Sequence, residues 1–166
     1  MQKAFLFLTS VFLFSITVFA QFTPNGKQLG FGLTLGEPLG ASVAYSLTPQ
    51  TSLQGAIGLS YFGSPRIQAD HLWHFDAFRN SEFSLYAGAG AVIGIGEGKG
   101  LWNDTKAGFY YRKSGLGLAV RGVFGAKFIP QGTDFDIFVE MGPLFGLVPD
   151  FGSAFDAALG VRFYPN

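Results

Sequence analysis

The segment that decides the fold lies close to the C-terminus, at positions 154–164, and reads AFDAALGVRFY. Every second residue from Phe155 to Phe163 is apolar, whereas the residues between them include Asp156 and Arg162. Alternation with a period of two is typical of a β-strand with one apolar face and one polar or small face. The segment therefore predicts a strand that lies between two different environments.

The same alternation returns along the chain from about residue 28 onwards. Seven further segments show it, and turn residues such as Pro49, Gly63 and Pro149 stand between them. Short connections of this kind favour antiparallel neighbours joined as hairpins. The sequence predicts eight strands, at 28–35, 41–47, 53–61, 67–76, 83–94, 115–128, 134–142 and 154–164.

The composition excludes several classes of protein. Of the 166 residues, 48% are hydrophobic and only 13% are charged, about half the roughly 25% that is usual in soluble domains. The 11 Lys and Arg residues balance 11 Asp and Glu residues, which argues against a nucleic-acid partner. The chain has no cysteine, so a disulfide scaffold or a cysteine metal site is impossible. Its 20 Phe residues also exclude intrinsic disorder.

Residues 1–20 predict a secretory signal peptide. Lys3 supplies the early positive charge, an apolar run follows, and Ala20 is a small residue at the expected cleavage point. A membrane-anchoring helix would need about 20 apolar residues, and Ser and Thr residues interrupt this run. We therefore expect an exported protein whose single domain spans residues 21–166.

The two faces of the predicted strands indicate the surrounding solvent. One face is rich in Phe, Leu, Ile and Val and carries no Lys, Arg, Asp or Glu in any of the eight strands; the other is mostly Gly, Ala and Ser with a few charges. A charge on a lipid face costs about 2–4 kcal/mol at mid-depth, and a closed barrel pairs all its backbone groups. The pattern predicts an all-β fold, an eight-stranded antiparallel up-and-down transmembrane β-barrel. A secreted soluble barrel that binds an apolar ligand remains an alternative.

The long connection at 94–114 breaks the alternation and gathers charged and aromatic residues. We expect it to be a mobile external loop, with short turns at the other end of the barrel. Aromatic residues near the strand ends predict two interfacial girdles. The members are Trp73, Phe75, Phe83, Phe128, Phe135, Phe163 and Tyr164 on the short-turn side, and Tyr61, Phe62, Tyr110, Tyr111 and Phe155 on the loop side.

Three short segments, Gly-Glu-Pro at 36–38, DHLWH at 70–74 and DIFVE at 136–140, resemble an uncharacterised outer membrane protein beta-barrel family. Together with the signal peptide and the amphipathic last strand, the chain from about 27 to 164 is similar to the small bacterial barrels of the OmpA/OmpX type. The resemblance implies a monomer in the bacterial outer membrane, with outer-membrane lipids and the barrel-insertion machinery as partners. Such barrels commonly end on an aromatic residue, whereas here Pro165 and Asn166 follow.

Charges on the inner face predict a structural polar network that plugs the lumen. Hairpin pairing places Lys127 opposite Asp136, Asp136 near Arg162, and Arg121 diagonal to Glu140. Such ions would neutralise one another because unpaired buried charges are costly. A narrow solute channel is the alternative interpretation of the same charges. The predicted network consists of Asp70, His74, Tyr86, Arg121, Lys127, Asp136, Glu140, Asp156 and Arg162.

No catalytic, cofactor or metal site is predicted. His71 falls on the apolar face, as do the histidines of barrel enzymes that act on lipid A, but its neighbours there are Ala69 and Trp73 rather than Ser. A lipid A-modifying enzyme therefore stays an alternative only. The glycine-rich run at 94–100 lacks Ser or Thr after Lys99 and is not a phosphate loop. We expect a non-enzymatic structural or surface-interaction barrel that could meet an external ligand through loop 94–114.

Overall fold

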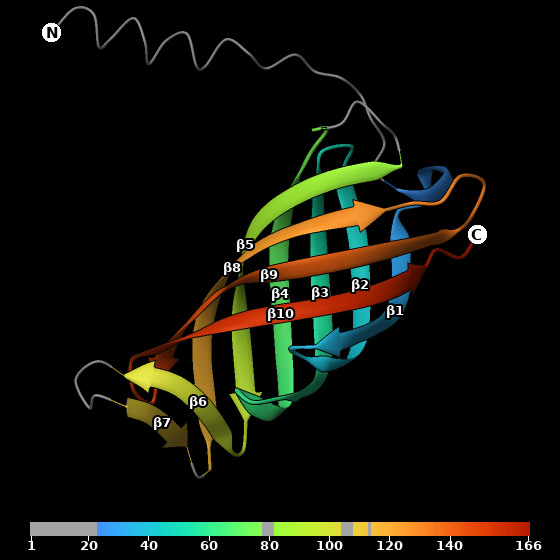
Figure 1. Ribbon diagram of the computed structural model, residues 1–166. Coiled ribbons are helices and arrows are strands. Elements are labelled where there is room, and N and C mark those ends of the chain that lie inside the picture. Colours follow the sequence, from blue (N-terminus) through green and yellow to red (C-terminus); the bar gives the residue numbers. More distant parts are fainter. Residues whose placement is uncertain (1–22, 78–81, 104–107, 113) are drawn as a thin grey trace, which may run out of the picture.

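A computed structural model describes residues 23–77, 82–103, 108–112 and 114–166, so the predicted signal peptide lies outside the described residues. No helix in the described ranges is long and apolar enough to cross a membrane. Within them lie a short 3-10 helix, η1 (Pro24–Gly26), and ten strands (Figure 1). The strands are β1 (Leu29–Gly36), β2 (Leu39–Thr48), β3 (Thr51–Ser60), β4 (Gly63–Phe75), β5 (Phe83–Ile95), β6 (Gly98–Asn103), β7 (Gly108–Arg112), β8 (Leu116–Phe128), β9 (Phe135–Val148) and β10 (Gly152–Phe163).

Eight of the described strands form a closed antiparallel barrel. Neighbours follow the order β1, β2, β3, β4, β5, β8, β9, β10, and β10 pairs back onto β1. The closing pair joins Phe31 to Phe163 and Gly36 to Ala158. The first described residues, before β1, and the C-terminus lie at one end of the barrel, the termini end, and β6 and β7 project from the other (Figure 1). The predicted eight-stranded all-β barrel is confirmed.

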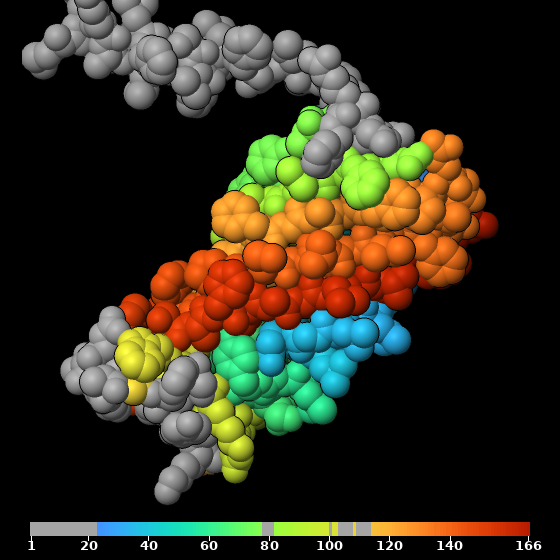
Figure 2. All heavy atoms as spheres, viewed as in Figure 1, coloured from blue at the N-terminus to red at the C-terminus, as the bar shows by residue number. Residues whose placement is uncertain are grey.

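Side chains alternate between the inside and the outside of this barrel, as strand geometry requires. In β9, Phe135, Ile137, Val139 and Met141 are about half exposed on the outside, whereas Asp136 and Glu140 between them are buried inside. Figure 2 shows the outer surface over β9 and β10, where the side chains form a continuous layer along the tilted strands. Most of the larger apolar residues therefore cover the outside, and the charges of the strands point into the lumen.

The connection at 94–114 differs from the predicted irregular loop, because β6 and β7 pair as a hairpin within it. The hairpin rests against β10 through the pairing of Trp102 with Ser153. Leu101 turns inward and packs with Phe62, Val92 and two other residues of the barrel mouth. The charges in this segment hide its strand pattern in the sequence, while its aromatic residues have high β propensity.

The predicted contrast between short turns and a long loop depends on this hairpin alone. At the end that carries the termini, the barrel strands are joined by residues 49–50, 76–82 and 129–134. At the other end, three of the four connections are also short, with two or three residues each, at 37–38, 61–62 and 149–151.

The aromatic girdles are only partly as predicted. Tyr61, Phe62 and Tyr164 point inward instead, where the Tyr61 and Tyr164 hydroxyls donate hydrogen bonds to Asp156 and Asp136. Tyr164 lies two residues after Arg162, so its side chain points to the same inner face. Tyr61 and Phe62 form the two-residue turn between β3 and β4, and both side chains fold towards the lumen. The side chains of Tyr110 and Tyr111 lie outside the described part. The outward members are Trp73, Phe75, Phe83, Phe135, Phe155 and Phe163, with Phe128 half-buried.

Closure of the barrel makes a specific demand on Gly32. This residue pairs with Arg162, and a Cβ atom at position 32 would lie 1.8 Å from the Val161 carbonyl oxygen. We expect Gly32→Ala to prevent the pairing of β1 with β10 and to remove the faster-migrating, heat-modifiable band in SDS gels. Gly55→Ala is the control, because its Cβ would lie on the outer face and meet only a side-chain atom of Val43, at 3.1 Å, so the strands can still pair. A full heat-modifiable band from Gly32→Ala would contradict the closure described above.

Candidate functional site

The interior of the barrel is charged but balanced. Among the described residues, four basic and four acidic side chains of the barrel strands lie inside, and each is at most 5% exposed. Buried charges are tolerated only when they are paired and hydrogen-bonded, so the equal numbers matter. The eight residues are Arg66, Arg121, Lys127, Arg162, Asp70, Asp136, Glu140 and Asp156.

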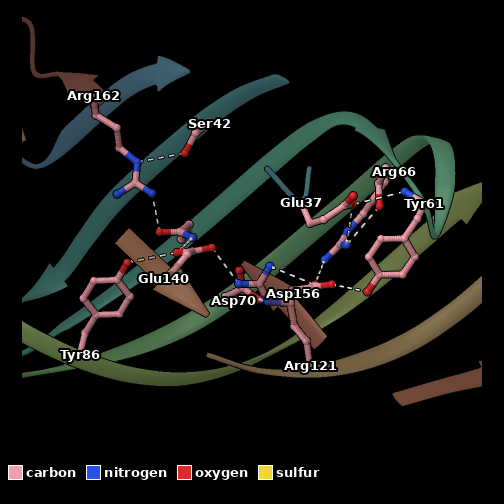
Figure 3. A network of polar contacts seen from close by, with 12 residues as sticks. Glu37, Ser42, Tyr61, Arg66, Asp70, Tyr86, Arg121, Glu140, Asp156 and Arg162 are labelled. Atoms are coloured by element: carbon pink, nitrogen blue, oxygen red, sulfur yellow. Dashed lines mark hydrogen bonds and ion pairs between the residues drawn. The ribbon is translucent and has the colours of Figure 1, made fainter. Parts of the chain in front are cut away.

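Arg121 of β8 lies at the centre of this polar interior (Figure 3). Its Nη2 is 2.8 Å from Glu140 Oε1 on β9, and its Nε is 3.3 Å from Asp70 Oδ1 on β4. Its Nη1 is 3.8 Å from Asp156 Oδ2 on β10. One guanidinium therefore joins four strands across the lumen, two of which do not neighbour β8 in the sheet.

Arg162 of β10 makes a second set of contacts, nearer the termini. Its Nε donates to Ser42 Oγ at 3.0 Å and its Nη2 to Gln54 Oε1 at 2.5 Å, while Nη1 lies 3.8 Å from Asp136 Oδ2. The Gln54 amide then donates to Glu140 Oε2 at 2.7 Å. Gln54 thus connects the contacts of Arg162 with those of Arg121.

A third group closes the end of the barrel that carries the hairpin. Arg66 Nη2 lies 2.5 Å from Asp156 Oδ2, and the Tyr61 hydroxyl donates to the other oxygen of the same carboxylate. Burial and the adjacent Asp156 charge raise the pKa of Tyr61, so it remains a donor. Glu37, in the turn between β1 and β2, lies 3.8 Å from Arg66, and burial raises its pKa despite Ser60 and Arg66. The apolar cluster of Phe62 and Leu101 lies beside this group at the mouth.

A smaller cluster at the opposite mouth holds the segment before β1 against the end of β10. Lys27 Nζ lies 2.8 Å from Asp134 Oδ1 and 3.1 Å from the Tyr164 carbonyl oxygen. Asn25 donates to the same Asp134 oxygen at 2.7 Å. Hydrogen bonds from Lys27 and Asn25 hold the pKa of Asp134 below its usual value of 3.8. The segment before β1, the end of β10 and the turn before β9 are thereby joined.

The structure places all nine residues of the predicted network inside the barrel. His74 lies across from Tyr86 as expected, with ring centroids 5.6 Å apart, and its Nε2 is 2.8 Å from Ser52 Oγ. Lys127 is one correction, because it pairs with Phe138 and not with Asp136. The turn closed by Thr133 and Pro130 lies at the predicted position, but Phe128 pairs with Ile137, so β9 is displaced by two residues from symmetric pairing about that turn.

Several network members were missing from the sequence interpretation. Arg66 lies one residue before the strand that the sequence predicts from Ile67, although its position alternates in step with Gln68 and Asp70. Ser42 and Gln54 stood on the small inner face without charge, so nothing marked them as hydrogen-bonding partners of Arg162. Parity along the longer β4 was the signal that could have found Arg66.

The site shows no arrangement for metal chemistry. In the part of the chain that the structure describes, no group of three His, Cys, Asp or Glu side chains could hold a metal ion. His71 lies outward between Leu53 on β3 and Ala89 on β5. The interior is therefore a set of ion pairs and hydrogen bonds that ties the strands together.

No family model matches the chain, and no curated protein matches it. Among solved structures, the N-terminal beta-barrel domain of OprF from Pseudomonas aeruginosa is similar, with a TM-score of 0.55 and 18% sequence identity. The match covers 82% of this chain and 94% of that chain. At this identity the likeness concerns the fold, and it agrees with the closed eight-stranded barrel described above.

Removal of the central arginine tests the interior. Arg121→Met would leave Asp70, Glu140 and Asp156 without their shared cation, so we expect the free energy of unfolding to fall by about 3–5 kcal/mol. The free energy of unfolding is measured by urea titration of the protein in vesicles, with the folded band in SDS gels as the signal.

In the double variant, Glu140→Gln removes one of the three carboxylates that lost their cation, so it should recover part of the loss. Lys99→Met removes an exposed pair of 3.7 Å and should cost under about 1 kcal/mol; equal losses in both single variants would contradict the central role.

The cluster at the termini should respond to acid. Because the folded pKa of Asp134 is lowered, its contribution is fully present above the unfolded value near 3.8 and disappears as the pH falls through the folded value. Asp134→Asn should therefore reduce the hydrogen-exchange protection of the Gly26 and Lys27 amides at pH 6. At pH 2 the variant and the wild type should be alike. A difference that persists undiminished at pH 2 would argue against the carboxylate as the cause.

Proposed function

We propose that this protein is an integral barrel of the bacterial outer membrane, structural or surface-interacting in type and without enzymatic activity. The observation that carries the proposal is the distribution of charge between the two faces. Every Lys, Arg, Asp and Glu of the eight barrel strands, all of which the structure describes, points inward, and large apolar side chains such as Phe124 and Leu33 are more than 60% exposed outside. Such an exterior suits hydrocarbon and would aggregate in water.

The dimensions of the barrel support the same conclusion. Its strands have between 8 and 14 residues, and about 9–11 tilted residues suffice to cross a bilayer. Outward aromatic residues such as Trp73 and Phe163 lie at the strand ends, where interfacial belts are found. The resemblance to OmpA/OmpX-type barrels and the likeness to the OprF barrel domain both agree with this placement.

The interior favours a closed barrel over a narrow channel. Arg121, Arg66 and Arg162 span the lumen with ion pairs and hydrogen bonds, and Phe62 and Leu101 fill the mouth at the hairpin end. Eight strands leave room for little beyond side chains. A lipid A-modifying enzyme gains no support, because the cross-strand neighbours of outward His71 are apolar.

The hairpin supplies the surface for an external ligand. Lys99 and Trp102 of β6 and Phe151 of the neighbouring turn are exposed beyond the barrel wall. We propose that this end faces the outside of the cell, that the barrel is a monomer surrounded by outer-membrane lipids, and that the barrel-insertion machinery places it there.

Single cysteines test this arrangement, because the chain has none of its own. In intact cells of a host with an outer membrane, a membrane-impermeant maleimide should label Lys99→Cys on the hairpin. Gln131→Cys, exposed at the end with the termini, should be labelled only after the outer membrane is permeabilised. Recovery of the protein in the soluble fraction without detergent, or equal labelling of both variants in intact cells, would overturn the proposal.

A further inference from the structure

His71 is an exception on the outside of the barrel. Within the eight barrel strands, which are all described, the other outward polar side chains lie within three residues of a strand end, whereas His71 lies four residues inside the end of β4. Its outward neighbours across the sheet are Leu53 and Ala89. A polar group inside hydrocarbon is costly unless it has a hydrogen-bond partner, so its partner needs to be identified.

The protein itself gives the imidazole no such partner among the described residues. Its Nδ1 is buried without a hydrogen bond, which leaves Nε2 as the nitrogen that a molecule outside the barrel can reach. Its ring packs against the Trp73 indole in a T-shaped arrangement, with centroids 4.6 Å apart. Ala89, directly opposite, is too small to cover the ring. The imidazole can therefore donate or accept a hydrogen bond only with a molecule from the surrounding phase.

An apolar groove lies on the same outer face, and its nearest point on β4 is level with Ala69, two residues from His71. It has a volume of about 420 Å³, within the range of roughly 300–1,000 Å³ that small-molecule sites occupy. Gly55 pairs with Ala69, which is the next outward residue after His71 on β4. Because Gly55 has no side chain, the surface is hollowed there, and Val43, Ile57 and Ile67 line the hollow. Such a groove fits a hydrocarbon chain.

The order of these features along β4 points to one occupant. From the end of the strand inward, Phe75 and Trp73 lie at the level of lipid headgroups, His71 follows two residues later, and Ile67 of the groove lies deeper. Headgroup, ester and acyl chain follow one another in the same order in a glycerophospholipid. Two residues correspond to roughly 7 Å along a strand, which brings His71 to the level of the ester.

We propose that His71 and this groove bind one acyl chain of an ester-linked glycerophospholipid from the leaflet at the termini end. The imidazole donates a hydrogen bond to the ester carbonyl oxygen, and the chain lies between Val43 and Ile67. The site rests on the proposed membrane placement and adds a specific lipid to the general surrounding of the barrel. It requires no chemical change in the lipid.

Native mass spectrometry of the detergent-solubilised full chain tests the site, with dipalmitoyl phosphatidylethanolamine and its dihexadecyl ether analogue as probes. The wild type should retain one ester lipid about fivefold better than the ether lipid, the ratio that one net hydrogen bond provides. His71→Phe keeps the ring against Trp73 and should reduce this ratio to about one. Gly55→Leu fills the groove and should weaken retention of both lipids. Ala126→Leu, outward between Leu85 and Val139, is the matched control and should behave as wild type.

If the wild type retained the ester and ether lipids equally, the inference would be overturned. It would also be overturned if Ala126→Leu and Gly55→Leu weakened lipid retention equally, because the bound lipid would then be unselective. Each variant is first checked for the heat-modifiable band, so that a folding defect is not taken for lost binding. A chain that does not need detergent at all would instead overturn the membrane placement. The two failures are therefore distinguishable.

Discussion

Eight strands enclose an interior that has room for side chains only, so every charge that points inward must meet its counter-charge within the lumen. Arg121 meets this requirement for three carboxylates at once, on β4, β9 and β10. Asp156 in turn is shared with Arg66. Because the partners come from strands on different sides of the barrel, the pairs also hold these sides together across the lumen.

The small inner residues are a consequence of the same restriction. A Cβ atom at Gly90 would lie 2.0 Å from Asp70 Oδ1, and one at Gly125 would lie 2.3 Å from the Tyr86 ring. Glycine at these positions gives the carboxylate and the phenol the space in which they reach Arg121 and Glu140. The abundance of glycine and the scarcity of charge in this chain are therefore two aspects of one packed polar interior.

Features set by neighbouring residues could be predicted from the sequence, whereas features set by the closed barrel could not. The period of two predicts the eight strands and the inward position of Asp136 and Arg162. The partner of Lys127 depends on how the chain enters β9 after the turn at Pro130 and Thr133, and a displacement of two residues there keeps every side chain on its face but changes its partner. The inward turn of Leu101 depends on a mouth that exists only after Phe62 and Val92 have come together.

The two histidines of β4 show how the faces of one strand meet different solvents. They are three residues apart and therefore point to opposite sides of the wall. His74 points inward and meets Ser52, so the protein satisfies its imidazole from within. His71 points outward beside an apolar groove, where the described chain offers it a T-shaped contact with one indole and no hydrogen bond. On the proposed membrane placement, the same side chain finds its partner in the protein on one face and in a lipid on the other.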